Sequence, residues 1–151
     1  MNILEVIQNI QKQISNPQIN NGGCIHFAYY LSEALKRYGF EHKVIAIERS
    51  YDACYLKELL KYQEGCMHIV VYIKGIGYVD ATNIYSKLSE YAKFEIVSIS
   101  FPRDYDLNKL RNNKHIWNSC YNRSYNYNLK SIITSSFKQI EYVKLKSIRK
   151  K

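Results

Sequence analysis

Residues 68–82 read HIVVYIKGIGYVDAT, and this stretch decides the fold that the sequence predicts. β-Branched and aromatic side chains dominate both of its halves, and the intervening KGIG contains two glycines that suit a tight reversal. We therefore predict a β-hairpin over residues 68–82. If Tyr72 faces Tyr78 across the turn, His68 and Asp80 fall on one face of the sheet as diagonal neighbours, about 7 to 8 Å apart at the backbone.

The second decisive stretch, CIHFAYYLSEALKRYG at residues 24–39, has the spacing of a helix. Gly39 stands where a left-handed C-terminal cap is usually found. We expect a helix from Cys24 to Tyr38 that forms the centre of the core, with Cys24 at its start. The apolar positions recur at intervals of three and four, as an amphipathic helix requires: Phe27, Ala28, Leu31, Ala34, Leu35 and Tyr38.

The rest of the chain supplies elements of both kinds. Spaced isoleucines predict an amphipathic helix near the start, and short β-branched runs predict strands. Serine, asparagine, proline and glycine mark loops. By residue range, we expect a helix over 2–14, a loop over 15–23, a strand over 43–48, a short helix or excursion over 52–63, a short helix near 84–92, a strand over 94–101, an irregular connection over 103–128 and a helix or strand over 129–142.

Length and composition indicate a single domain with one hydrophobic core and a cytoplasmic location. The chain has 151 residues, 46% of them hydrophobic, which predicts a single domain over residues 1–151. No stretch approaches the roughly 20 apolar residues of a membrane span, and MNILEVIQNIQKQ lacks the apolar centre of a secretory signal. We expect a cytoplasmic protein that does not bind membranes.

The four cysteines, Cys24, Cys54, Cys66 and Cys120, contain no CxxC pair, so we expect thiols instead of disulfides. A zinc site from Cys54, Cys66 and His68 is conceivable, but a structural zinc needs four ligands, usually in two close pairs. We therefore expect no metal and no other cofactor.

Three residues have the pattern of a nucleophilic site. A thiol in the first turn of a helix meets unpaired amides and the positive end of the helix dipole, which favour the thiolate, so Cys24 is the best nucleophile. Gly22 and Gly23 leave room for a substrate backbone beside it. His68 opens a strand and can accept the proton, and Asp80 can fix the imidazole tautomer.

Each of these residues also has an ordinary structural explanation. A cysteine at a helix start is commonly a small buried hydrophobe, a histidine at a strand edge is commonly a surface residue, and an aspartate before Ala81 and Thr82 can cap a turn. The joint arrangement, with a nucleophile at a helix start and a base and an acid on the strands that follow, favours catalysis.

The strings GGCIHFAYYLSEALKRYGF and HIVVYIKGIGYVDAT resemble the transglutaminase-like branch of the papain-like superfamily. The resemblance covers about residues 20–83. It implies an α+β fold with a papain-like/transglutaminase-like core, in which a Cys-bearing helix packs on an antiparallel β-sheet. It also implies Cys24 as nucleophile, His68 as general base and acid, and Asp80 as the carboxylate that orients His68. Ile69 and Ala81 depart from the pattern, which leaves the subfamily open.

An oxyanion hole would combine the backbone amide of Cys24 with one side-chain donor. Gln18 is the first choice, because it precedes Cys24 by six residues, the separation found in papain-like proteases; Asn20 and Asn21 are alternatives. His26 should point away from Cys24 as a surface or core residue. His115 is the alternative to His68.

These features predict a cysteine-dependent acyl-transfer enzyme, a peptidase, deamidase or transglutaminase-like protein, that forms a thioester on Cys24. Its partner would be a protein, a peptide or a small acyl substrate. The net charge of +9 and the 15 tyrosines leave an alternative, a non-catalytic module on the same fold that binds nucleic acid or an acidic protein.

Overall fold

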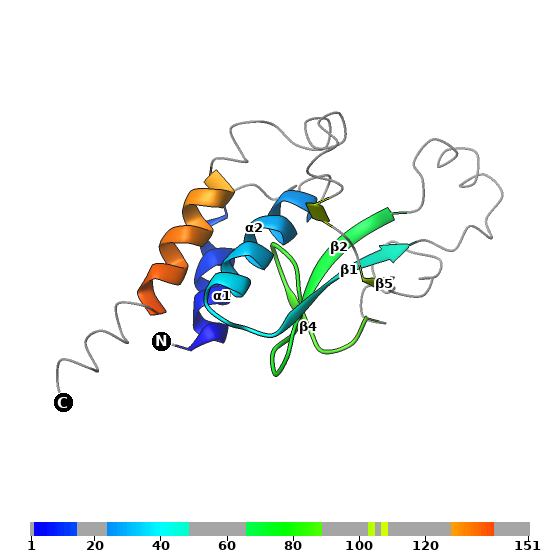
Figure 1. Cartoon of the computed structure of the whole chain (residues 1–151), viewed down its shortest axis with the longest axis horizontal. Coiled ribbons are helices and arrows are strands. Elements are labelled where there is room, and N and C mark those ends of the chain that lie inside the picture. The colour runs from blue at the N-terminus through cyan, green and yellow to red at the C-terminus, as the bar shows by residue number, and fades with distance from the viewer. Residues whose placement is uncertain are drawn as a thin grey trace.

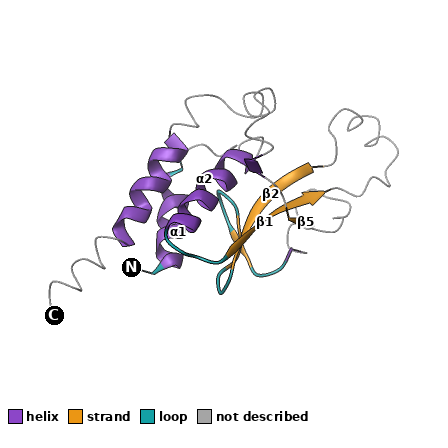
Figure 2. Ribbon diagram, in the orientation of Figure 1, coloured by secondary structure: helices purple, strands orange, loops and turns teal. Residues whose placement is uncertain are grey.

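The computed structural model describes residues 2–14, 24–48, 66–88, 103–104, 107–108 and 128–140. Within them the protein is α+β: three helices lie together beside an antiparallel sheet (Figures 1 and 2). The elements expected over 15–23, 52–63 and 94–101 lie outside the described residues, as does most of the connection over 103–128.

Helix α1, Ile3–Gln13, confirms the first predicted helix. Its N-terminus is capped by Asn2, whose Oδ1 accepts a hydrogen bond of 2.9 Å from the backbone N–H of Glu5. A cap of this kind satisfies one of the amides that have no acceptor within the helix. Helix α1 packs against the core through three fully buried apolar residues, Val6, Ile7 and Ile10.

Helix α2, Cys24–Arg37, begins at the predicted residue and ends as the glycine indicated. Gly39 has φ of 77°. Its N–H bonds to the Lys36 carbonyl at 3.2 Å, and the Phe40 N–H bonds to the Leu35 carbonyl at 2.9 Å. This pair of bonds is a Schellman motif, which satisfies carbonyls at the end of the helix and turns the chain into the sheet.

The part of the sheet that lies in the described residues has five strands in the order β4-β3-β2-β1-β5, and its pairings are antiparallel. The predicted register of the hairpin is confirmed, because Tyr72 faces Tyr78. A register shift between Ile47 and Glu48 lies beside His68 on the facing strand. The strands are β1, His42–Glu48; β2, Cys66–Ile73; β3, Gly77–Val79; β4, Ile84–Tyr85; and β5, Arg103–Asp104.

Two predicted elements are corrected in part. The helix expected near 84–92 is wrong over Ile84–Tyr85, which form β4 by pairing with Val79 and Tyr78. Pairing with an existing strand outweighs weak helical periodicity in so short a segment. Likewise, Arg103–Asp104 form an edge strand on β1 within the stretch expected to be irregular.

The segment expected as a helix or strand near the C-terminus is a helix over residues 128–140. The ring centroids of Phe137 and Tyr38 lie 5.5 Å apart, which joins this helix to α2. The Gln13 amide donates a 3.2 Å bond to the Ser136 hydroxyl, which joins it to α1.

The two faces of the sheet belong to different clusters. Ile69, Val71 and Ile73 of β2 are buried with the helices in the main core. The alternate residue, Val70, is buried on the other face in a smaller cluster with tyrosines 72, 78 and 85. Among the described residues, no helix has the length and apolar character needed to cross a membrane.

Candidate active site

Cys24 is the first residue of α2, and its side chain is only 7% exposed. The thiol is free. Because the first amides of a helix lack intrahelical acceptors, the sulfur lies at an end that carries partial positive charge. The same helix contacts β2, the strand that carries the candidate base.

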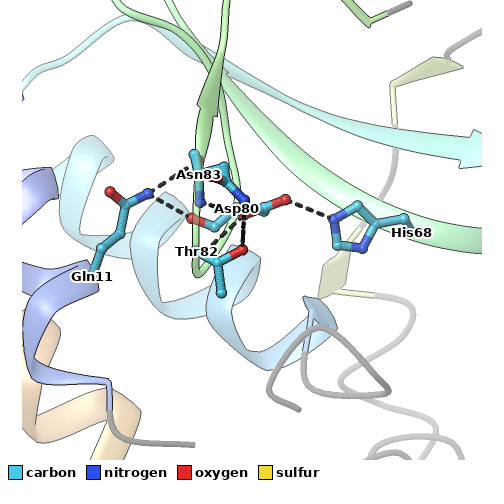
Figure 3. Close-up of polar contacts among 5 residues, drawn as sticks. All are labelled: Gln11, His68, Asp80, Thr82 and Asn83. Carbon is cyan, nitrogen blue, oxygen red and sulfur yellow. Dashed lines mark hydrogen bonds and ion pairs between the residues drawn. The ribbon is translucent and has the colours of Figure 1, made fainter. Parts of the chain in front are cut away.

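His68 lies in β2 and is 9% exposed. Its Nε2 lies 3.2 Å from Oδ2 of Asp80. Figure 3 shows the two side chains pointing toward each other. The Cys24 thiol is near enough to the imidazole to raise its pKa. The structure therefore brings His68 and Asp80 into contact and places Cys24 near the same imidazole.

Opposing effects set the charge of His68. Burial lowers the pKa of the imidazole, because a charged ring loses hydration. The hydrogen bond with Asp80, the neighbouring Cys24 and the negative charge of Asp80 raise it further than burial lowers it. The result is a pKa of His68 of about 9, compared with an ordinary value of 6.5, so the ring holds a proton at neutral pH.

Both carboxylate oxygens of Asp80 accept hydrogen bonds, Oδ1 within its own turn and Oδ2 from His68. Oδ1 accepts bonds from the backbone N–H groups of Thr82 and Asn83, at 2.9 and 2.8 Å, and from the Thr82 hydroxyl at 3.1 Å. Oδ2 is thereby directed to His68. Burial raises the pKa of Asp80, but the bonds from His68, Thr82 and Asn83 outweigh it and leave that pKa below its usual range.

One contact at the site was missed by sequence reasoning. The Nε2 amide of Gln11, in α1, donates to the carbonyl of Asp80 at 3.0 Å and to that of Asn83 at 3.1 Å. Figure 3 shows Gln11 reaching the turn on the side away from His68. Its signal in the sequence is faint: a polar residue four positions after Ile7, beside the apolar stripe of α1.

The remaining predicted site residues lie outside the described part of the chain. These are Gln18, with its alternatives Asn20 and Asn21, the two glycines Gly22 and Gly23, and His115. His26 is fully buried, so of the two roles expected for it, the core role is correct.

The described residues contain no group of three or more histidine, cysteine, aspartate and glutamate side chains that could hold a metal ion. Cys54, which the zinc alternative requires, lies outside them. The groups that meet here are an imidazole and a carboxylate joined by a hydrogen bond, with one thiol near the imidazole. That set is suited to nucleophilic chemistry with proton transfer.

Comparisons of the chain with protein-family models, with curated proteins and with solved structures found no match.

Proposed function

We propose that the protein is a cysteine-dependent acyl-transfer enzyme with a papain-like/transglutaminase-like core. One observation carries the proposal: the buried imidazole of His68 lies 3.2 Å from the Asp80 carboxylate and near enough to the Cys24 thiol for that group to raise its pKa. A nucleophile, a base and a residue that orients the base are the parts that covalent acyl transfer requires.

In the proposed reaction the Cys24 sulfur attacks the carbonyl carbon of an amide or ester. Protonated His68 gives its proton to the departing amine or alcohol as the C–N or C–O bond breaks, which leaves a thioester on Cys24. His68 then accepts a proton from water or an amine, which attacks the thioester and releases the acyl group. Asp80 keeps the ring oriented and stabilises its positive charge throughout.

The tetrahedral intermediate needs donors for its negative oxygen. The N–H of Cys24 belongs to the first turn of α2 and has no acceptor within the helix, so it is the first donor we assign. Gln18 remains the predicted second donor. The oxygen would then be stabilised by one backbone and one side-chain hydrogen bond.

Three described features support the transglutaminase-like family. The cysteine begins a helix, the histidine lies on the first strand of a hairpin, and the aspartate directly follows the second strand. The substrate we propose is a protein, a peptide or a small acyl compound, with water or an amine as acceptor.

An activated ester tests the proposal directly. Incubation with p-nitrophenyl acetate should place an acetyl group on Cys24, seen by mass spectrometry of the digested protein, and turnover should release p-nitrophenol. Cys24→Ala should form no adduct at that site. An adduct on another cysteine at an equal rate, or none on Cys24 under conditions in which free cysteine reacts, would exclude the nucleophile that we assign.

A groove favours a second candidate function, the binding of an acidic protein segment. The groove has a volume of about 810 Å³ and lies between α2 and the helix 128–140. Lys130 and Lys138 line it from one helix, eight residues or about 12 Å apart, which matches about four residues of extended peptide. Lys36 and Arg37 line it from the other, with Glu33 as the single acid.

The exposed cations of this groove suit the carboxylates of an acidic peptide. Among the aromatic residues that line it, Phe137 is fully buried and Tyr29 is 7% exposed, whereas Tyr30 and Tyr38 are half-buried. Carboxylates need only the exposed cations, and Arg37 can bind one through two parallel hydrogen bonds.

Charge reversal tests the second function. The pair Lys130→Glu and Lys138→Glu should weaken binding of a labelled oligoglutamate peptide by about tenfold or more. The pair Lys12→Glu and Lys43→Glu changes the net charge equally at exposed positions that do not line the groove, and should have a small effect. Equal losses would mean that total charge alone attracts the peptide. Tighter binding of oligothymidine would favour a nucleic-acid partner.

A further inference from the structure

Gln11 connects two parts of the chain that are far apart in sequence. It belongs to α1, whereas the carbonyl groups that it bonds belong to Asp80 and Asn83, 69 and 72 residues later. Both bonds come from the same amide nitrogen, which has two hydrogens and can supply one to each carbonyl. The Gln11 amide thus bonds the first and the last residue of the turn 80–83.

The bonded turn is the one that carries the candidate acid. Its backbone is also closed internally, because the Asp80 N–H donates to the Asn83 carbonyl at 3.1 Å. The Asp80 carboxylate accepts hydrogen bonds from the N–H groups of Thr82 and Asn83 in the same turn. Gln11 of α1 donates a further hydrogen bond to the Asp80 carbonyl. Within these contacts, Gln11 is the one side chain from another element that fixes the Asp80 backbone.

The position of Gln11 is itself firmly held. One helical turn before it, Ile7 is fully buried, and the adjacent Ile10 is fully buried as well. A donor on such a helix has little freedom to move. The turn that it bonds is therefore restricted as well. Loss of the two bonds would leave the Asp80 carbonyl without this donor and would widen the range of positions open to the carboxylate.

We propose that Gln11 is a positioning residue, which holds the turn of Asp80 so that its carboxylate stays in contact with His68. This inference rests on the proposed function for its catalytic meaning, but its geometric content concerns the Asp80–His68 contact alone. Gln11 does not touch Cys24 or His68 through any of its described bonds and is not a catalytic residue.

Gln11→Met is the decisive variant, since methionine keeps the length and helix preference of glutamine and removes both donors. Gln13→Met is the matched control. Gln13 belongs to the same helix and also donates from its amide, but to the Asn9 carbonyl and the Ser136 hydroxyl instead of the Asp80 turn. Both variants should lose some stability, so thermal melting alone would not separate a positioning role from a structural one.

The separating readout is the titration of the His68 ring, followed by NMR in the full chain and assigned with His68→Gln. Gln11→Met should lower the His68 pKa from about 9 by about one unit, a tenfold change in proton affinity, because the carboxylate that raises it is held less firmly. Gln13→Met should leave the midpoint unchanged. If Gln11→Met does not fold, Gln11→Asn, which keeps an amide but is one methylene short, should give a smaller shift in the same direction.

A His68 midpoint that is the same in the wild type and in the folded Gln11 variant would overturn the inference, whatever happens to the melting temperature. Failure of the proposed function is distinguishable from that result. If Cys24 forms no acyl adduct in the wild type while the His68 midpoint still shifts only in the Gln11 variant, the positioning contact stands and the enzyme assignment falls.

Discussion

The Nε2 atom of His68 lies 3.2 Å from Oδ2 of Asp80, although the ladder between β2 and β3 ends one residue before the aspartate, at the pair Val71 and Val79. The two residues therefore meet through side chains where β3 leaves the sheet. The turn beginning at Asp80, bonded by its own Oδ1, aims Oδ2 back at the strand. The contact depends on that turn and on the hairpin together.

Substitutions at the three residues should have unequal effects. Cys24→Ala removes the covalent route, and His68→Ala removes both proton transfers, at a cost of about 10² to 10⁴ in rate for the latter. Asp80→Asn keeps size and hydrogen bonding but loses the charge that stabilises the imidazolium, so its loss should be smaller. Steady-state rates on an ester substrate measure the order, with thermal melting to confirm folding. Wild-type activity in a folded Cys24→Ala variant would contradict the assignment.

The raised pKa of His68 predicts that stability falls at high pH. The folded state binds this proton more tightly than the unfolded state, whose value is 6.5. The contribution is thus complete below about pH 6.5 and is lost as the pH rises through about 9, amounting to about 3 kcal/mol. Urea unfolding across this window should show the decline in the wild type, and a much smaller one in His68→Gln. If the free energy of unfolding fell equally with pH in the wild type and in His68→Gln, His68 would have the same pKa in the folded and unfolded states.

Gly77 should be the least replaceable glycine of the hairpin. Its φ is 126°, and a Cβ there would lie 2.6 Å from the carbonyl oxygen of Tyr85 in β4. Gly75 has φ of 83° but nothing within 4 Å of a Cβ, so it is the matched control. Gly75→Ala should cost about 1 to 2 kcal/mol for the left-handed backbone. Gly77→Ala should cost about 1 to 3 kcal/mol more, because β4 must move. Equal free energies of unfolding would refute the close approach.

A partly buried hydrogen bond joins α2 to β1. The Ser32 hydroxyl lies 2.8 Å from Nε2 of His42, and Nδ1 of His42 lies 2.8 Å from the Phe40 carbonyl. A carbonyl only accepts, so Nδ1 donates to it, and in the neutral ring Nε2 is then the acceptor for the Ser32 hydroxyl. A double-mutant cycle with Ser32→Ala and His42→Phe should give a coupling of about 1 kcal/mol. Additive effects of the two substitutions would show that the bond contributes nothing to stability.

Sequence patterns predicted the parts of the fold that are governed by local periodicity. The stripe of α1, the helix that starts at Cys24, the cap at Gly39 and the facing pair Tyr72 and Tyr78 are all present. The last of these mattered most, because the hairpin brings the end of β3, which Asp80 follows, back beside β2, which carries His68. Their contact depends in addition on the turn that begins at Asp80, beyond the β2–β3 ladder.

Contacts between distant segments were not predictable in this way. Ile84–Tyr85 are too short to show a strand period, and they become β4 because β3 offers a free edge. Gln11 gives little hint of its role, because its partners are backbone carbonyls far along the chain, and backbone groups leave no trace in sequence. Long-range hydrogen bonds to the backbone are in general invisible to pattern analysis.

Selective alkylation is the most direct test of the central claim that Cys24 is an activated nucleophile paired with His68. The full chain is treated with iodoacetamide at near-neutral pH, and the rate of modification at each of Cys24, Cys54, Cys66 and Cys120 is followed by mass spectrometry, in the wild type and in His68→Gln. Cys24 should react much faster than the other three, since it combines a helix N-terminus with a neighbouring imidazole, and His68→Gln should remove that advantage. Equal rates at all four cysteines in the folded wild type, or a fast Cys24 that is indifferent to His68, would contradict the account.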